Sequence, residues 1–274
     1  MKKMSFEESQ QCALEIARCF SELCDKEGFR YYLAYGTLIG AVRHQGFIPW
    51  DDDFDVQMPR PDYDRFMDYM KQNPQALAPY YPMNMENTKD YPHNQTRLVD
   101  KTTWIDVVNE KDCNLGIFMD IIVLEGLGDD YKKAIGVMSK AKRLSSSIFL
   151  AARTRFHFGL TKGWKKKILK PLAYIYTHLL GVKYFVDKSF ALYKDLDYTN
   201  SKYIGSVRWC TYAPQKEIFL KEWFEDRVKC KFDKYEFYVP EHYDDVLRQL
   251  YGDYMQLPPE KDRIRHHLYK AYKK

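Results

Sequence analysis

The sequence predicts an α/β (α+β) protein with a mixed sheet core and a basic helical insertion. Strand-like and helix-like segments alternate over the first half of the chain, which is typical of a sheet packed against helices. A long span without acidic residues follows, and strand-like segments then return. We therefore expect a core in 1–130, a basic, mostly helical region in 131–200, and a C-terminal part in 201–274 that returns to the core.

The N-terminal segment predicts an amphipathic helix. Ser5 and Glu8 have the spacing of a capping box, in which each side chain accepts a hydrogen bond from the other residue's backbone N–H. One face of the helix carries apolar residues at three- and four-residue spacing: Ala13, Ile16, Phe20 and Leu23.

The remaining elements follow from composition and from helix-breaking residues. We expect a strand in 29–36, a short helix in 37–44 ended by Gly46, a strand in 53–58, a helix in 60–73 and a loop in 74–94. Further strands are expected in "TRLVD", "TTWIDVV", "GIFMDIIVL", "YIGSVRW" and "KYEFYVP", and a last helix in "EHYDDVLRQLYGDYM".

Charge is unevenly distributed along the chain. The net charge is +5, but residues 131–186 contain 13 Lys and Arg and no Asp or Glu, which leaves 30 basic and 38 acidic residues elsewhere. Within this span, 160–185 combine a lysine cluster with an apolar, aromatic run that Pro171 and His178 are expected to break. Such a segment can lie on an anionic membrane surface, or pack on the core as a helix with a solvated basic face. Nucleic-acid binding is the weakest interpretation, because the chain contains no recognisable reading motif.

The sequence predicts neither export nor a membrane span. The N-terminus lacks the apolar core of a leader peptide, and no run of about 18 apolar residues occurs. The six cysteines form no zinc-ligand pattern, and we expect them to be reduced. We expect a cytoplasmic protein, attached at most peripherally to the cytoplasmic face of a membrane.

An acidic stretch is the main chemical signal. Asp51, Asp52, Asp53 and Asp55 lie within five residues, and like charges this dense repel one another unless a cation neutralises them. Asp53 and Asp55 are two apart in the expected strand, so their carboxylates would share one face. Two carboxylates on one face can share a hard divalent cation.

Two further segments complete this pattern. Asp120 in "FMDII" is the expected third acid, and Asp106 in "WIDVV" competes for that place. Gly36 and Thr37 stand between a strand and a helix start, where backbone N–H groups bind phosphate. The ordered combination favours phosphoryl or nucleotidyl transfer with Mg²⁺ or Mn²⁺.

The stretch "YYLAYGTLIGAVRHQGFIPWDDDFDVQMPR" closely resembles the signature of the LicD family. The resemblance continues through "TRLVDKTTWID", "GIFMDIIVLEGL" and "LRQLYGDYMQLPPEKDRIRHH", and skips much of 130–200. It implies a nucleotidyltransferase-like catalytic core related to the fukutin-type proteins. It also implies transfer of phosphocholine (choline phosphate) from CDP-choline to a hydroxyl of a lipid-linked cell-surface glycan precursor, of teichoic acid or lipopolysaccharide.

The resemblance also implies roles for individual residues. Asp53, Asp55 and Asp120 are the expected catalytic and metal-binding residues, with Mg²⁺ (or Mn²⁺) as cofactor. The expected substrate-binding residues are Gly36, Thr37, Arg43, Trp50, Asp51, Asp52, Arg263, His266 and His267. Choline is expected against aromatic faces, for which Tyr35, Trp50 and Trp104 are candidates by proximity to the motifs.

Other readings of the same residues remain open. The fold could transfer another group, such as a polyol phosphate or a nucleotide, or the chain could be a catalytically silent membrane assembly partner. The expected partners are a CDP-choline donor, a lipid-linked glycan acceptor and a membrane surface contacted through 160–185, with no nucleic acid.

Overall fold

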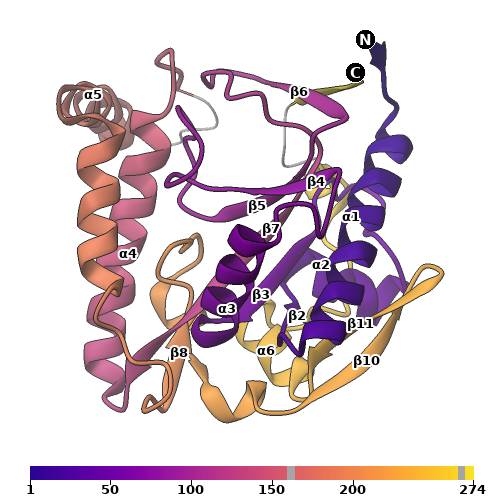
Figure 1. Ribbon diagram of the computed structural model, residues 1–274. Coiled ribbons are helices and arrows are strands. Elements are labelled where there is room, and N and C mark those ends of the chain that lie inside the picture. Colours follow the sequence, from indigo (N-terminus) through magenta and orange to yellow (C-terminus); the bar gives the residue numbers. More distant parts are fainter. Residues whose placement is uncertain (159–163, 265–268) are drawn as a thin grey trace.

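A mixed sheet forms the centre of the computed structural model (Figure 1), which describes residues 1–158, 164–264 and 269–274. Its strands run in the order β2-β3-β7-β5-β4. Their bounds are Tyr32–Leu33 (β2), Asp55–Pro59 (β3), Phe118–Gly128 (β7), Thr96–Asp100 (β5) and Tyr80–Met83 (β4). The β3–β7 pair is parallel and the other pairs are antiparallel. The predicted mixed α/β class is confirmed.

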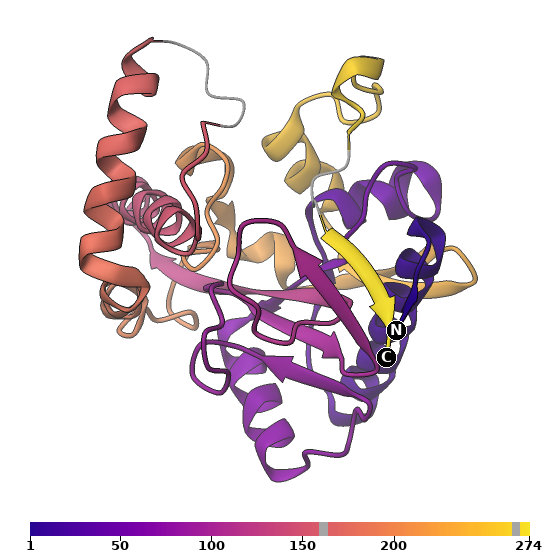
Figure 2. The ribbon, with the colours of Figure 1, turned by 90° about the horizontal axis from the view of Figure 1, so that it is seen from above.

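Helices lie on both sides of this sheet (Figures 1 and 2). The helices α1 (Phe6–Glu27) and α3 (Arg60–Gln72) pack against one face, and α2 (Tyr35–Ile39) and α6 (Tyr243–Tyr251) lie on the other side. The predicted capping box of Ser5 and Glu8 is present at the start of α1. The predicted apolar stripe of α1 is buried in the core.

The last third of the chain returns to the first. Strand β8 (Tyr203–Gly205) pairs with β7 and with β9 (Phe219–Leu220), and β10 (Arg227–Phe232) forms a hairpin with β11 (Tyr235–Pro240). Strand β12 (Tyr269–Lys273) lies between β1 (Lys2–Lys3) and β6 (Thr103–Val107). The two ends of the chain therefore lie side by side (Figure 2).

Two long helices form one edge of the molecule (Figure 1): α4 (Tyr131–Ala151) and α5 (Trp164–Tyr193). Pro171 and His178, which interrupt the apolar run, both lie inside α5, and the helix bends at Gly181. Gly181 has φ 77° and ψ 162°. Only glycine adopts this backbone conformation readily, since a Cβ would clash there.

Several predicted boundaries need correction. The strand expected in 29–36 is reduced to β2, because a helix already starts at Tyr35 (φ 46°) and continues as a π-helix, η1 (Gly40–His44). Gln45, in the left-handed conformation, ends this helix instead of Gly46. The strand expected from Asp53 begins at Asp55, and the expected loop contains β4. Short 3₁₀ helices span Pro214–Lys216, Lys221–Phe224 and Glu260–Asp262.

Candidate active site

The parallel pairing of β3 with β7 places two of the predicted acids side by side. Asp55, the first residue of β3, pairs in register with Asp120 of β7. Paired residues on neighbouring strands direct their side chains to the same face of a sheet. Asp106, the competing candidate, is exposed on β6, in the other sheet. The structure therefore favours Asp120 as the acid beside Asp55.

The residues before β3 bring further carboxylates together. Asp51, Asp52 and Asp53 each offer one carboxylate oxygen, and these three atoms lie within 4.8 Å of one another. The i, i+2 strand argument for Asp53 is wrong, because Asp53 precedes the strand. Asp53 instead belongs to a loop, which Gln10 holds through a 2.8 Å hydrogen bond from Nε2 to the Asp51 carbonyl.

Gly36 and Thr37 hold this acidic loop in place. A Cβ at position 36 would overlap the Asp51 carboxylate, so the glycine lets this side chain lie against α2. The Thr37 hydroxyl accepts a 2.9 Å hydrogen bond from the Asp55 backbone N–H. Both residues thus position aspartates, and their expected contact with phosphate stays a prediction.

Arg97 is a member of the site that sequence reasoning missed. Its Nε donates a 2.8 Å hydrogen bond to Oδ1 of Asp120, and its guanidinium carbon lies 3.8 Å from the centroid of the Phe118 ring. Both charged side chains are buried. An arginine next to the apolar Leu98 and Val99 in the strand "TRLVD" was the available signal, because a buried guanidinium normally has an acidic partner.

The electrostatics of the cluster favour a bound cation. Burial, assisted by the neighbouring Asp53 and Asp52, raises the pKa of Asp51 to about 9. Burial and the nearby acids raise the pKa of Asp55 well above its usual range, although Arg97 opposes this. The ionised form of the cluster is therefore costly without a compensating positive charge. An all-carboxylate donor set fits hard cations such as Mg²⁺ and Mn²⁺.

Of the predicted substrate-binding residues, Arg263 belongs to the segment that follows α6, and Arg43 and Trp50 contact that segment. The Arg263 guanidinium lies 5.5 Å from the Trp50 ring centroid, so the structure brings these two residues together. Arg43 donates to the backbone carbonyls of Tyr254 and, at 3.3 Å, Gln256. Arg43 therefore anchors this segment against η1. His266 and His267 lie outside the described residues.

Residues 28–110 match the family model described as the LicD/FKTN/FKRP nucleotidyltransferase domain. The chain is 35% identical, over 277 residues, to lipopolysaccharide cholinephosphotransferase LicD of Haemophilus influenzae, and the match covers 99% of each chain. The chain belongs to the LicD family. The predicted resemblance is confirmed, and this LicD-family chain is an enzyme of the phosphotransferase class.

Shorter matches fall on two uncharacterised rickettsial proteins. The one from Rickettsia typhi is 36% identical over 73 residues, which is 26% of this chain and 24% of that protein. The one from Rickettsia prowazekii is 57% identical over 35 residues, 13% of each chain. The matched family domain contains the acidic loop, β3 and Arg97, whereas Asp120 comes from the chain beyond it.

The LicD-family site also has a tyrosine cluster that spans both ends of the chain. Tyr35 stacks on Tyr212, with ring centroids 6.1 Å apart, and the Tyr251 ring stands at 83° to Tyr212. Burial raises the pKa of Tyr212 and Tyr251, and the charges of Asp55 and Asp51 add to this effect, so the rings lie near the acids. Tyr212 was missed because it lies outside the segments that resemble the family, and Tyr251, in the last of them, is distant in sequence from the acidic motif.

A buried carboxylate fixes this tyrosine cluster. Glu217 is fully buried and accepts hydrogen bonds from the Thr211 backbone N–H at 2.9 Å, the Tyr212 backbone N–H and the Tyr35 hydroxyl at 3.2 Å. Burial raises its pKa to about 7, although these donors oppose the shift. Trp104, another candidate for choline, instead contacts Tyr272 of the second sheet.

Proposed function

We propose that this LicD-family enzyme transfers phosphocholine from CDP-choline to a hydroxyl of a lipid-linked cell-surface glycan precursor, with Mg²⁺ or Mn²⁺ as cofactor. The observation that carries the proposal is the register pairing of Asp55 with Asp120 beside the Asp51–Asp53 loop. The relative from H. influenzae, named for transfer to lipopolysaccharide, supports phosphocholine as the group and favours a lipopolysaccharide precursor over teichoic acid.

The acids of the site would hold the cation, and one of them, Asp120, would also accept a proton. Asp53, Asp55 and Asp120 would hold it, and Asp51 and Asp52 add negative charge at the same place. When bound, the cation neutralises the pyrophosphate of the donor and makes CMP a better leaving group.

Arg97 prepares Asp120 for the transfer step. Its hydrogen bond fixes one Asp120 oxygen and thereby orients the other. The acceptor hydroxyl oxygen bonds to the phosphorus that bears choline, the bond from this phosphorus to the CMP oxygen breaks, and the hydroxyl proton passes to Asp120. The products are a phosphodiester and CMP.

The tyrosine cluster supplies the chemistry that a choline group needs. A quaternary ammonium cannot donate a hydrogen bond, and it is attracted to the faces of aromatic rings. Tyr212 and Tyr251 are half-buried beside the acids. Glu217 lies behind Tyr35 and Tyr212 and holds both in place. We assign the trimethylammonium group to the faces of Tyr212 and Tyr251.

The test is CMP release from CDP-choline, measured with and without Mg²⁺ or Mn²⁺ and with a lipid-linked glycan extract. The proposal predicts metal-dependent release that the extract stimulates, loss of release in Asp120→Asn, and retention in the matched surface control Asp106→Asn. If CDP-ribitol, CDP-glycerol or a nucleoside triphosphate were cleaved and CDP-choline were not, the proposed donor would be wrong and the cleaved compound would take its place. No release from any donor would favour the silent assembly partner.

A further inference from the structure

The first half of α5 exposes an apolar ridge. Ile168, Leu172, Ile175 and Leu179 are 57%, 59%, 56% and 81% exposed. Their spacing of four, three and four residues places them on one face of the helix. Leu169 and Tyr176, on an adjoining face, are also more than half exposed. The ridge is therefore continuous, unlike the single exposed apolar residues that any protein surface carries.

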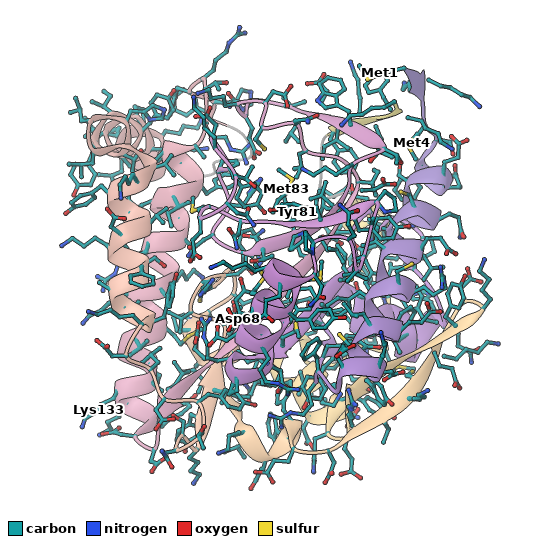
Figure 3. The ribbon with its side chains drawn as sticks, viewed as in Figure 1. Met1, Met4, Asp68, Tyr81, Met83 and Lys133 are labelled. Atoms are coloured by element: carbon teal, nitrogen blue, oxygen red, sulfur yellow. The ribbon has the colours of Figure 1, made fainter. Side chains whose placement is uncertain are left out.

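The opposite face of the same helix is fixed to the body of the protein. A ring nitrogen of His178 lies 2.8 Å from the Arg153 carbonyl, and Lys170 donates a 2.6 Å hydrogen bond to the Phe158 carbonyl. The Tyr174 ring packs edge-on against Phe156. The orientation of α5 is thus determined, and the ridge points away from the protein. The side chains around this helix form the outer edge of the molecule in Figure 3.

The stretch of sequence that contains the ridge carries charge of one sign. Residues 131–186 contain no Asp or Glu, and the described Arg143, Arg155 and Lys167 are exposed. A second copy of the chain docked ridge to ridge would bring these bases together, and their repulsion opposes such a dimer. An anionic lipid surface offers both the apolar layer and the opposite charge.

We propose that the first half of α5 lies in the surface of an anionic membrane, with Ile168, Leu172, Ile175 and Leu179 inserted below the headgroups. The helix rests on the membrane without crossing it, since no helix among the described residues is long and apolar enough to span a bilayer. The bend at Gly181 ends the ridge and returns the chain along α4 to the core.

This attachment would orient the active site. The first half of α5 and the segment after α6 project on the same side of the sheet (Figure 2). That segment is the one that Arg43 anchors and that carries Arg263. The membrane would therefore face the side from which a lipid-linked acceptor arrives. Only this consequence depends on the proposed function, because the ridge and its charge exist whatever the enzyme transfers.

The test is flotation of the whole enzyme with vesicles made either of phosphatidylcholine alone or of equal parts phosphatidylcholine and phosphatidylglycerol. The wild type is expected to float with the anionic vesicles at low salt and to be released as salt rises. Leu172→Glu combined with Leu179→Glu should lower the bound fraction at least ~10-fold, because apolar burial is replaced by anion repulsion. Val228→Glu combined with Tyr81→Glu, on β10 and β4, is the matched control and should bind as the wild type does.

Two results would overturn the proposal. One is equal flotation of the ridge variant and the wild type. The other is that the wild type is a dimer in solution while the ridge variant is a monomer that still binds vesicles, which would make the ridge a contact between copies.

Hydrogen exchange gives a second measurement, since vesicles should protect the backbone amides of 168–180. CMP release without vesicles should be equal in the ridge variant and the wild type, which separates this proposal from the proposed function.

Discussion

Helices α1 and α5 carry apolar residues at the same spacing and use them differently. In α1 the stripe from Ala13 to Leu23 is buried against the sheet, whereas in α5 the ridge from Ile168 to Leu179 is exposed. Helical periodicity alone therefore shows that a face is apolar, but not what covers it. Core packing and membrane contact both satisfy the same pattern.

The charges on the two helices do separate these cases. The polar face of α1 mixes both signs, and Arg18 pairs with Glu15 and Glu22 at 2.8 and 2.7 Å. Such a face is acidic overall, with six Asp and Glu against two Lys and Arg in α1, and it suits water. Residues 131–186, which include the first half of α5, contain basic residues and no acidic ones. The comparison assigns catalysis to the acidic core and membrane attachment to the basic helices. Each assignment can be tested by a variant in its own region.

The largest effect is expected from Asp55→Asn in the core. It removes a carboxylate that the cation site needs, so kcat for CMP release should fall by on the order of 10³-fold. In the presence of EDTA its thermal midpoint should equal or exceed that of the wild type, because one of several repelling buried acids is gone. If the variant lost activity and its thermal midpoint in EDTA fell below that of the wild type, Asp55 would be needed for folding.

A smaller effect is expected where the two regions meet. Glu110, before β7, lies 3.1 Å from the Arg153 guanidinium near the end of α4, and 3.2 Å from Nε2 of His93. Burial opposes ionisation of Glu110, but these partners outweigh it and lower its pKa to about 2. Burial also lowers the pKa of His93, so Arg153 is the charged partner at neutral pH. Glu110→Gln should cost about 2 kcal/mol of unfolding free energy.

The pH dependence of stability checks this ion pair. Since the folded pKa of Glu110 lies below the unfolded value, its contribution is complete above pH about 4.5 and is lost as pH falls toward about 2. The difference in unfolding free energy between wild type and Glu110→Gln should therefore shrink over that interval. A difference that is constant with pH would exclude the ion pair as its source.

Donor recognition should respond to the tyrosines by about one order of magnitude. Tyr212→Leu removes an aromatic face worth about 1–2 kcal/mol to a desolvated cation, so the Kd for CDP-choline should rise about 10-fold. The Kd for CMP, which lacks choline, should stay unchanged. Trp104→Leu in the second sheet is the control. If Tyr212→Leu weakened the binding of CDP-choline and CMP equally, Tyr212 would contact the nucleotide instead of choline.

The smallest effect is expected at the bend of α5. Gly181→Ala places a Cβ on a residue with φ 77°, which should cost about 1 kcal/mol or more of stability. The measurement is chemical unfolding of the variant beside Gly136→Ala, a substitution inside α4 where a Cβ has open space. Equal stability of the two variants would mean that α5 straightens without cost.

The sequence predicted the long elements and the acidic motif, and it failed where distant segments meet. The capping box and stripe of α1, strand β5 and helix α3 follow from local rules, and the structure confirms them. The partnership of Arg97 with Asp120 depends on the β5–β7 register, and the contact of Tyr212 with Tyr35 depends on the return of the C-terminal part. The arginine within a strand signals an acidic partner without identifying it, and Tyr212 leaves no local pattern, because both contacts are consequences of the sheet order.

The most direct test takes one variant from each region and measures the property assigned to each region on both variants. Asp55→Asn and the Leu172→Glu/Leu179→Glu double variant are each measured for metal-dependent CMP release from CDP-choline without vesicles, and for flotation with anionic vesicles. We predict that Asp55→Asn loses release and keeps flotation, and that the double variant keeps release and loses flotation. If either folded variant loses both properties, or if each loses the property assigned to the other region, the division between an acidic catalytic core and a basic attachment region is contradicted.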